Sequence, residues 1–233
     1  STSDGADACL VVGNLTVDQL KEIPTFGLER SVSQFCFERN LELLKKNPVD
    51  FEFKQMDPAV AAGNMQANPD QTQSIVVWNP FVLETLRKQS KSRVLFDSST
   101  IPEEIIDLVV AGKDSMGKAD ADKFAACVAD VFYEFSRRMN DESTRNETLT
   151  ALGENYSGMA VDDMNTIVQQ TKFYATPEDA VGLFTGEKFQ KTTTPMISEF
   201  CASHEMLSKK PRVGFDDDTA QLNYSTATLK SVQ

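Results

Sequence analysis

Apolar residues in the first half of the chain fall into short blocks, and polar stretches separate each block from the next. The blocks rich in β-branched and aromatic residues predict buried strands at 8–13, 25–28, 51–56, 74–78, 93–96 and 105–110. Between the blocks, apolar residues recur at helical spacing, as they do over residues 32–45. Strands that alternate with helices indicate βαβ units, so we expect an α/β fold with a mainly parallel sheet.

Residues that favour helix starts follow several of these predicted strands. Thr16, Ser31 and Asp57 stand where an N-cap is expected, and Pro58 follows Asp57 directly. Pro80 is well suited as the first residue of a helix after the strand at 74–78. The polar segment 66–73 predicts a loop before that strand.

From Asp120 onward the apolar spacing is helical alone. A long amphipathic helix is predicted over 124–139, with Phe124, Cys127, Val128, Val131, Phe132 and Phe135 on one face. Further helices are expected at 141–152, 161–173, 177–184 and 192–204, with Asp141, Thr176 and Thr194 as caps. Such helices form either a bundle or a layer over a sheet made by other strands. Residues 216–233 are polar and predict a frayed tail.

Charge and hydropathy narrow the possible partners of the chain. The formal net charge of -12 and the pI near 4.6 argue against nucleic acid or an anionic membrane as the main partner. No apolar run approaches the ~20 residues of a membrane span. No basic region followed by a hydrophobic segment opens the chain, so no signal peptide is predicted.

Residues that carry catalysis or bind metals are sparse. Cys9, Cys36, Cys127 and Cys201 lie far apart beside apolar residues, which favours buried free thiols and leaves one long-range disulfide as the alternative. The only histidine, His204, comes late in a predicted helix. No phosphate-loop, dinucleotide-binding or nucleophile-elbow motif occurs. We therefore predict no catalytic residues, no metal site and no cofactor.

The first candidate binding group lies where a helix begins just after the strand at 25–28. Ser31, Val32 and Ser33 open that helix, whose free backbone N–H groups and partial positive charge suit a carboxylate, sulfonate or phosphate. Arg30 precedes them and strengthens the prediction of an anion site. The alternative is that Ser31 only caps the helix.

The second candidate group follows the strand at 74–78. Trp78 is either core packing or an aromatic wall of a ligand site, and Asn79 and Pro80 come directly after it. Ser98, in the polar segment after the strand at 93–96, is a candidate to line the same site. Ligands of open α/β sheets bind at the carboxyl ends of the strands, so we expect both groups to face one crevice.

Several short motifs together resemble the nitrate/sulfonate/taurine-type ABC-transporter substrate-binding proteins. The likeness covers roughly residues 7–215. It rests on LTVDQLK (15–21), FGLERSVS (26–33), MDPA (56–59), VWNP (77–80), VLFDSSTIP (94–102) and IIDLVVAGKD (105–114). The segment 66–73 departs from the family pattern.

The resemblance implies a periplasmic binding protein type II fold, in which two lobes joined by a hinge close over a ligand. Residues 12–104 would form lobe two, whereas 1–11 and 105–215 would be hinge crossings and the helical part of lobe one, followed by a polar tail at 216–233. Members of the family carry about a hundred further residues upstream, as two full lobes require. The helical half would then clad a sheet of lobe one.

The function implied by the resemblance is that of the solute-binding component of an ABC importer. The ligand would be small and anionic, like nitrate, a sulfonate or taurine, and the partners would be ABC permease subunits in a periplasmic or membrane-associated extracytoplasmic setting. One alternative is an enzyme on the same fold, a desulfinase or a thiamine-pyrimidine-forming relative, with Cys36 as the nearest nucleophile. Another is a fragment that mainly self-associates.

Overall fold

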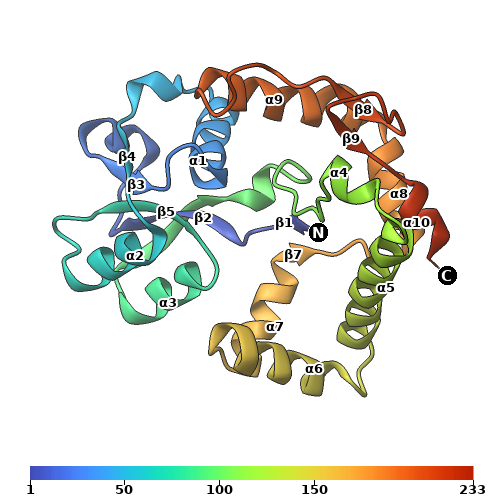
Figure 1. Cartoon of the computed structure of the whole chain (residues 1–233). Coiled ribbons are helices and arrows are strands. Elements are labelled where there is room, and N and C mark those ends of the chain that lie inside the picture. The colour runs from blue at the N-terminus through green and yellow to red at the C-terminus, as the bar shows by residue number, and fades with distance from the viewer. Residues whose placement is uncertain (233) are drawn as a thin grey trace. The chain divides into compact units, whose positions relative to one another are not determined.

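The computed structural model describes residues 1–232, which group into two units of polypeptide (Figure 1). We call residues 2–106 and 165–172 the α/β unit, and Ser1, residues 107–164 and the chain from Phe173 onward the helical unit. The chain therefore passes between the units several times, and each unit is described by itself.

A five-stranded sheet forms the centre of the α/β unit, in the order β4-β3-β5-β2-β6. Its strands are β2 (Asp7–Val12), β3 (Thr25–Gly27), β4 (Phe53–Gln55), β5 (Ser74–Trp78) and β6 (Ser92–Asp97). Strands β3, β4, β5 and β6 run in the same direction, and β2 lies antiparallel between β5 and β6. The expected α/β fold with a mainly parallel sheet is confirmed, with β2 as the one strand that runs the other way.

Helices connect the parallel strands and begin at the expected capping residues. The helices are α1 (Val32–Leu43), α2 (Pro58–Ala67) and α3 (Phe81–Lys88), with short 3₁₀ turns at Val17–Glu22, Pro48–Asp50 and Ser98–Thr100. Asp57 accepts from the amides of Ala59 (2.9 Å) and Val60 (3.3 Å), and the first 3₁₀ turn begins after Thr16. Pro80 stands one residue before α3 rather than inside it. Helix α2 also continues into the predicted loop at 66–73.

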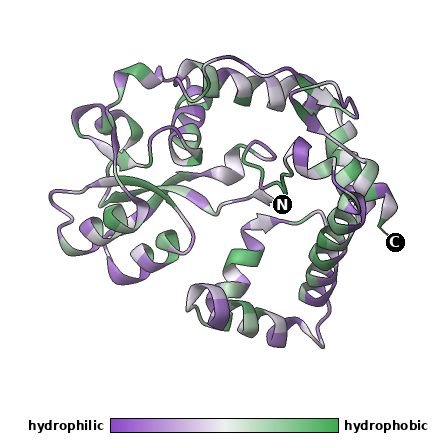
Figure 2. Ribbon diagram, in the orientation of Figure 1, coloured by the Kyte–Doolittle hydropathy of each residue, from purple (hydrophilic) through white to green (hydrophobic). Residues whose placement is uncertain are grey.

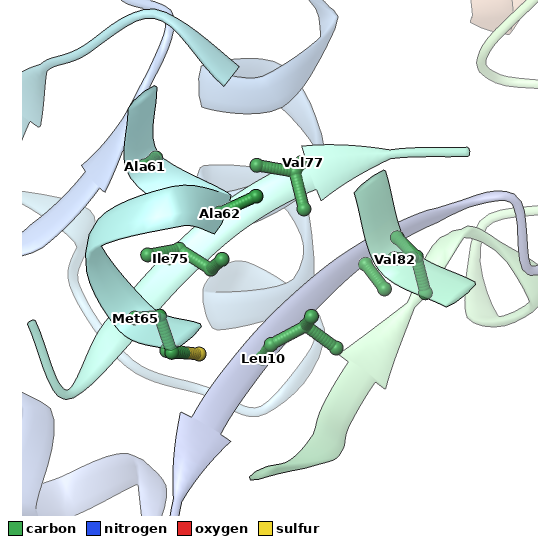
Figure 3. Close-up of a cluster of buried hydrophobic side chains, with 8 residues drawn as sticks. Leu10, Ala61, Ala62, Met65, Ile75, Val77 and Val82 are labelled. Atoms are coloured by element: carbon green, nitrogen blue, oxygen red, sulfur yellow. The ribbon is translucent and has the colours of Figure 1, made fainter. Parts of the chain in front are cut away.

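Apolar side chains of alternate strand positions fill both faces of the sheet. On one face, Figure 3 shows side chains from β2 and β5 packed against α2 and α3; this cluster comprises Ala8, Leu10, Ala61, Ala62, Met65, Ile75, Val77 and Val82. Helix α1 contacts the sheet on the other side, where Phe37 packs against Phe53 and Phe96 at ring distances of 5.3 and 6.0 Å. The sheet is thus buried on both sides, as near-continuous apolar strands predict (Figure 1).

Short extended segments run side by side where the chain leaves the α/β unit. Strand β1 (Thr2–Ser3) pairs antiparallel with β7 (Thr171–Lys172), and Thr2 also forms an isolated bridge with Ile106. The Ser3 amide donates to the Ile105 carbonyl at 3.0 Å. The predicted strand at 105–110 is therefore wrong: only this single bridge forms, and Val109 and Val110 are exposed because no neighbouring strand covers them.

The helical unit holds most of the remaining helices. They are α4 (Lys113–Met116), α5 (Ala121–Asn140), α6 (Arg145–Leu152), α7 (Val161–Gln169), α8 (Pro177–Thr185), α9 (Thr194–Ser203) and α10 (Ala227–Ser231), with π-helical turns at Gly153–Ser157 and Phe189–Thr193. Helix α7 crosses into the α/β unit after Met164. No helix among residues 1–232 is both long and apolar enough to span a membrane.

Two predicted caps and the predicted tail differ from the structure. Thr176 caps α8 as expected. Asp141 instead ends α5, four residues before α6 begins at Arg145, and accepts from the Ser143 amide at 2.8 Å. Thr194 lies inside a continuous helical stretch because a π-helical turn precedes it. The segment predicted to fray instead contains β9 (Leu222–Tyr224), paired parallel with β8 (Val213–Phe215), and helix α10. Gln233 lies outside the described residues.

Candidate functional site

The strand ends that the sequence singled out lie together at the border of the sheet where its parallel strands end, and we call this border the candidate edge. Gly27, at the end of β3, lies opposite Gln55 of β4 and Val76 of β5. On the other side of β5, Trp78 lies opposite Asp7, the first residue of β2. The turns after β3, β4, β5 and β6 therefore leave the sheet at the same edge, where open α/β sheets bind ligands.

The turn after β3 is held by local hydrogen bonds. The Ser31 hydroxyl accepts from the Ser33 amide at 3.1 Å and donates to the Leu28 carbonyl at 2.5 Å, so it caps α1. Arg30 has a positive φ of 54° and an exposed side chain, and its amide donates to Gln34 Oε1 at 2.8 Å. Val32 is exposed by 44%. The Ser31 hydroxyl therefore caps α1, as the alternative interpretation of the sequence predicted.

Ser33 differs from its neighbours because its hydroxyl is buried and unused. The residue is 1% exposed, and its Oγ has no hydrogen-bond partner within the described chain. It lies in the first turn of α1, where free backbone N–H groups and the helix dipole create a positive potential. A buried hydroxyl without a partner in such a place is a donor available for an anion.

A reciprocal pair of hydrogen bonds joins the turn after β3 to the end of β4. The Glu29 amide donates to Gln55 Oε1 at 2.6 Å, and the Gln55 amide donates to Glu29 Oε1 at 2.9 Å. This pair fixes the approach to α1. This pair was not predicted from the sequence, because two residues 26 apart give no local pattern.

The turn after β5 carries the second group. Trp78 is half-buried and packs edge-on to Phe81 at 6.4 Å between ring centroids. The Asn79 amide donates to the Ala6 carbonyl at 3.0 Å, and its side-chain Nδ2 donates to Gln170 Oε1 at 2.7 Å. Asn79 Oδ1 is buried and without a partner among residues 1–232. Pro80 follows Asn79 through a cis peptide bond.

Ser98 lies at the same edge but in a different role. It is fully buried, and its Oγ accepts from the Gly5 amide at 2.8 Å and shares a 2.7 Å hydrogen bond with Ser3 Oγ. The Asp7 amide is a third partner at 3.4 Å. The hydroxyl therefore holds the segment before β2 in place, and the candidate site does not include it.

The cysteines show what chemistry this region can support. Cys9 and Cys36 are buried as expected, whereas Cys127 is exposed, Cys201 is half-buried, and all are free thiols. Burial raises the pKa of Cys9 to about 12 and also raises the pKa of Cys36. Cys36 Sγ is 3.8 Å from the Asp7 carbonyl oxygen and 3.8 Å from Asn40 Nδ2, and neither is a base. Within residues 1–232, no group of three metal-ligating side chains comes together.

Several solved structures of ligand-binding proteins share this fold. The periplasmic aliphatic sulphonate-binding protein SsuA from Escherichia coli matches 90% of this chain with a TM-score of 0.65 and 18% identity. The alkanesulfonate-binding SsuA from Xanthomonas axonopodis pv. citri, bound to MOPS, also matches 90%, with a TM-score of 0.60 and 14% identity.

A third match is the ligand-binding component of an ABC-type import system from Staphylococcus aureus, solved with zinc, at a TM-score of 0.60 over 88% of this chain and 12% identity. The chain spans 66% of the E. coli and S. aureus proteins and 70% of the X. axonopodis protein. No family model and no curated protein matches the sequence. At these identities the likeness shows the fold.

Proposed function

We propose that this chain is the solute-binding component of an ABC importer, recognising a small sulfonate-like anion without a covalent step. The buried, unpartnered hydroxyl of Ser33 in the first turn of α1 carries the proposal. The fold shared with sulphonate-binding proteins supports it. An extracytoplasmic location and ABC permease subunits as partners belong to the same proposal.

Each group at the sheet edge has a distinct part in the proposed binding. The amino end of α1 supplies the positive potential, and Ser33 Oγ donates a hydrogen bond to an oxygen of the anion. Trp78 offers an apolar wall for the organic part of the ligand, and Asn79 Oδ1 offers an acceptor. The α/β unit would form the second lobe of such a binding protein, and the helical unit would contribute to its first lobe.

A Ser33→Ala variant separates binding from folding. Because Ser33 Oγ has no partner among residues 1–232, its removal is expected to leave the free energy of unfolding unchanged or to raise it by up to about 1 kcal/mol. Affinity for the anion should fall about tenfold, since one hydrogen bond to a charged group is lost. Calorimetry and thermal shift with nitrate, taurine, alkanesulfonates and bicarbonate measure both effects.

The matched control is Ser92→Ala. Ser92 begins β6 at the opposite edge of the sheet, and its hydroxyl donates to the Gln89 carbonyl at 2.7 Å. This variant should lose stability and keep its affinity. If no anion of the panel shifts the melting temperature of the wild-type protein, the proposed ligand class is wrong.

Catalysis on the same fold is less well supported. The enzyme alternative needs a reactive thiolate, but Cys36 is fully buried and burial raises its pKa. Its sulfur contacts a carbonyl and an amide group instead of a base. These features favour a binding protein.

Self-association is a second candidate because α5 has an exposed apolar stripe. Phe124, Val131 and Phe135 are exposed by 74%, 55% and 41% and share one helix face with Cys127. The hydropathy colouring of Figure 2 shows that both hydrophobic and hydrophilic residues occur along α5. The opposite face buries Tyr133, so the stripe is not used within the helical unit. In sedimentation, the double variant Phe124→Ser/Phe135→Ser should lose any association that the wild type shows. A wild type that stays monomeric at all concentrations would exclude this candidate.

A further inference from the structure

Gln170 comes from a distant part of the chain and contacts the candidate site directly. Its Oε1 accepts from Asn79 Nδ2 at 2.7 Å, across 91 residues of sequence. Gln170 lies between α7 and β7, and its backbone carbonyl accepts from the Asp4 amide at 2.8 Å. The residue is therefore fixed by the same short segments that connect the two units (Figure 1).

The Gln170 side chain lies against Gly5. Gly5 has a φ of 101°, and a Cβ placed there would lie 3.6 Å from Gln170 Cγ. The Gly5 amide is held by Ser98, so the segment that passes the Gln170 side chain is itself fixed. Gln170 thus meets Asn79 in a defined geometry.

The contact determines which half of the Asn79 carboxamide is used. Nδ2 is engaged by Gln170, whereas Oδ1 is buried and has no partner in the described chain. A buried acceptor without a donor is unfavourable, and a ligand that brings an N–H or O–H group removes the penalty. The unused side of Asn79 is therefore an acceptor that selects ligands with a donor.

We infer that Gln170 is a positioning residue that orients the Asn79 carboxamide and thereby makes the site prefer anions that also carry a hydrogen-bond donor. The ligand preference rests on the proposed function, whereas the hydrogen bond between Gln170 and Asn79 is present without a ligand. A ligand lacking the donor would leave Asn79 Oδ1 unpaired, so the preference should be about tenfold.

Two sulfonates of equal charge test the preference. Wild-type protein should bind 2-hydroxyethanesulfonate about tenfold more tightly than ethanesulfonate in calorimetry. Gln170→Met removes the acceptor at similar size and should reduce this ratio to within about twofold of unity. Gln170→Glu keeps an acceptor and should keep the ratio, since its added charge affects both ligands alike.

Thr171→Val is the matched control for a purely structural effect. The Thr171 hydroxyl donates to the Ile167 carbonyl at 2.9 Å, and Thr171 begins β7 directly after Gln170. This variant should keep the wild-type ratio even if it is less stable. A wild-type ratio near unity, or an unchanged ratio in Gln170→Met, would overturn the inference.

A measurement without ligand keeps the two proposals distinguishable. The side-chain NH₂ signals of Asn79, assigned by their loss in Asn79→Asp, should show one exchange-protected proton in wild-type protein and in Gln170→Glu, but not in Gln170→Met. An Asn79 signal that Gln170→Met leaves unchanged would refute the positioning role. If the signal responds as expected but neither sulfonate binds, the positioning role stands and the proposed ligand class fails.

Discussion

Two residues at the candidate edge, Ser33 and Asn79, each keep one buried polar atom without a partner among residues 1–232. Leaving such an atom unpaired costs about 1–3 kcal/mol, so folded proteins contain few of them. The amino-acid composition does not predict that these two atoms lack a partner. The helix-start pattern placed Ser33 at a plausible site, but only the packing around α1 shows that its hydroxyl is unused while that of Ser31 is occupied.

Replacing glycine with alanine is expected to change the free energy of unfolding in opposite directions at two positions of the α/β unit, Gly27 and Gly63. A Cβ on Gly27 would lie 2.9 Å from the Val76 carbonyl oxygen and 2.7 Å from the Phe53 ring, whereas nothing lies within 4 Å of the corresponding position on Gly63 in α2. Gly27→Ala should lower the free energy of unfolding by about 1–3 kcal/mol through overpacking. Gly63→Ala should raise it by about 0.5–1 kcal/mol because alanine favours the helix.

Urea unfolding followed by circular dichroism measures both glycine variants. Gly63 lies in the middle of α2 and Gly27 at the end of β3. Because each substitution adds only a methyl group, neither one adds or removes a polar group. Equal effects of the two substitutions would show that strand β3 tolerates a side chain at its crowded end.

Thiol reactivity should follow burial. With iodoacetamide at pH 8, we expect Cys127 to be modified first and Cys9 and Cys36 to stay unmodified until the protein unfolds, since burial raises the pKa of both inner thiols. Mass spectrometry of peptides from native and urea-treated protein measures this order. Rapid modification of Cys36 in the native protein would instead revive the enzyme alternative.

At the scale of elements, hydrogen bonds from the Thr226 amide and hydroxyl, both 2.7 Å, join Asp216 at the end of β8 to the start of α10. They lower the pKa of Asp216 below its ordinary value of 3.8. A carboxylate whose folded-state pKa is lowered contributes stability above its unfolded pKa and loses that contribution as pH falls through the folded-state pKa.

Acid should therefore weaken the attachment of α10. Protection of the backbone amides of residues 222–231 against exchange, taken relative to the intrinsic rate at each pH, should fall as the pH drops below about 3.8, the ordinary Asp pKa. In Asp216→Asn this protection should already be lower at pH 6 and should depend less on pH. The same pH dependence in wild type and variant would mean that another group holds this element.

The sequence predicted the elements whose signals are local and missed those that depend on distant partners. Strand β5, the cap at Asp57 and the helix start at Ser31 were confirmed because apolar runs and capping residues act within a few positions. The predicted strand at 105–110 failed because an apolar run needs a neighbouring strand to pair with. The β8–β9 pair was missed because its strands are only three residues long and polar loops surround them.

The site could be predicted in part for the same reason. Strand-end positions of Ser33, Trp78 and Asn79 follow from the order of elements, and the pairing registers place their turns at one edge. The partner contacts do not follow, since Gln55 and Gln170 reach the site from 26 and 91 residues away. For the same reason the sequence did not predict that the Ser98 hydroxyl is occupied, because its partners Ser3 and Gly5 lie 95 and 93 residues away.

At the scale of the molecule, the two units differ in how much apolar surface they bury. Among the described residues, 20 buried apolar side chains belong to the α/β unit and 6 to the helical unit, although the units are similar in length. The helical unit also exposes the apolar stripe of α5. Burial of apolar surface is the main source of stability, so the units should not be equally stable.

Hydrogen exchange should report this difference directly. Amides of β2 and β5 are expected to exchange most slowly, by global unfolding, whereas amides of α5 and α6 should exchange faster through local opening. Exchange followed by mass spectrometry of peptides from both units measures the contrast. Uniformly slow exchange in both units would mean that the helical unit is held by interactions other than apolar burial.

Strand β2 precedes both strands that flank it, since β5 and β6 follow tens of residues later. On the ribosome this interior strand is therefore synthesised before its two neighbours and waits with both of its sides unpaired, a state that invites aggregation. A shortened version starting at residue 12 would lack this strand and leave β5 and β6 without a neighbour between them. Expression trials should keep residues 2–12, and a chaperone that binds extended apolar segments should raise the yield.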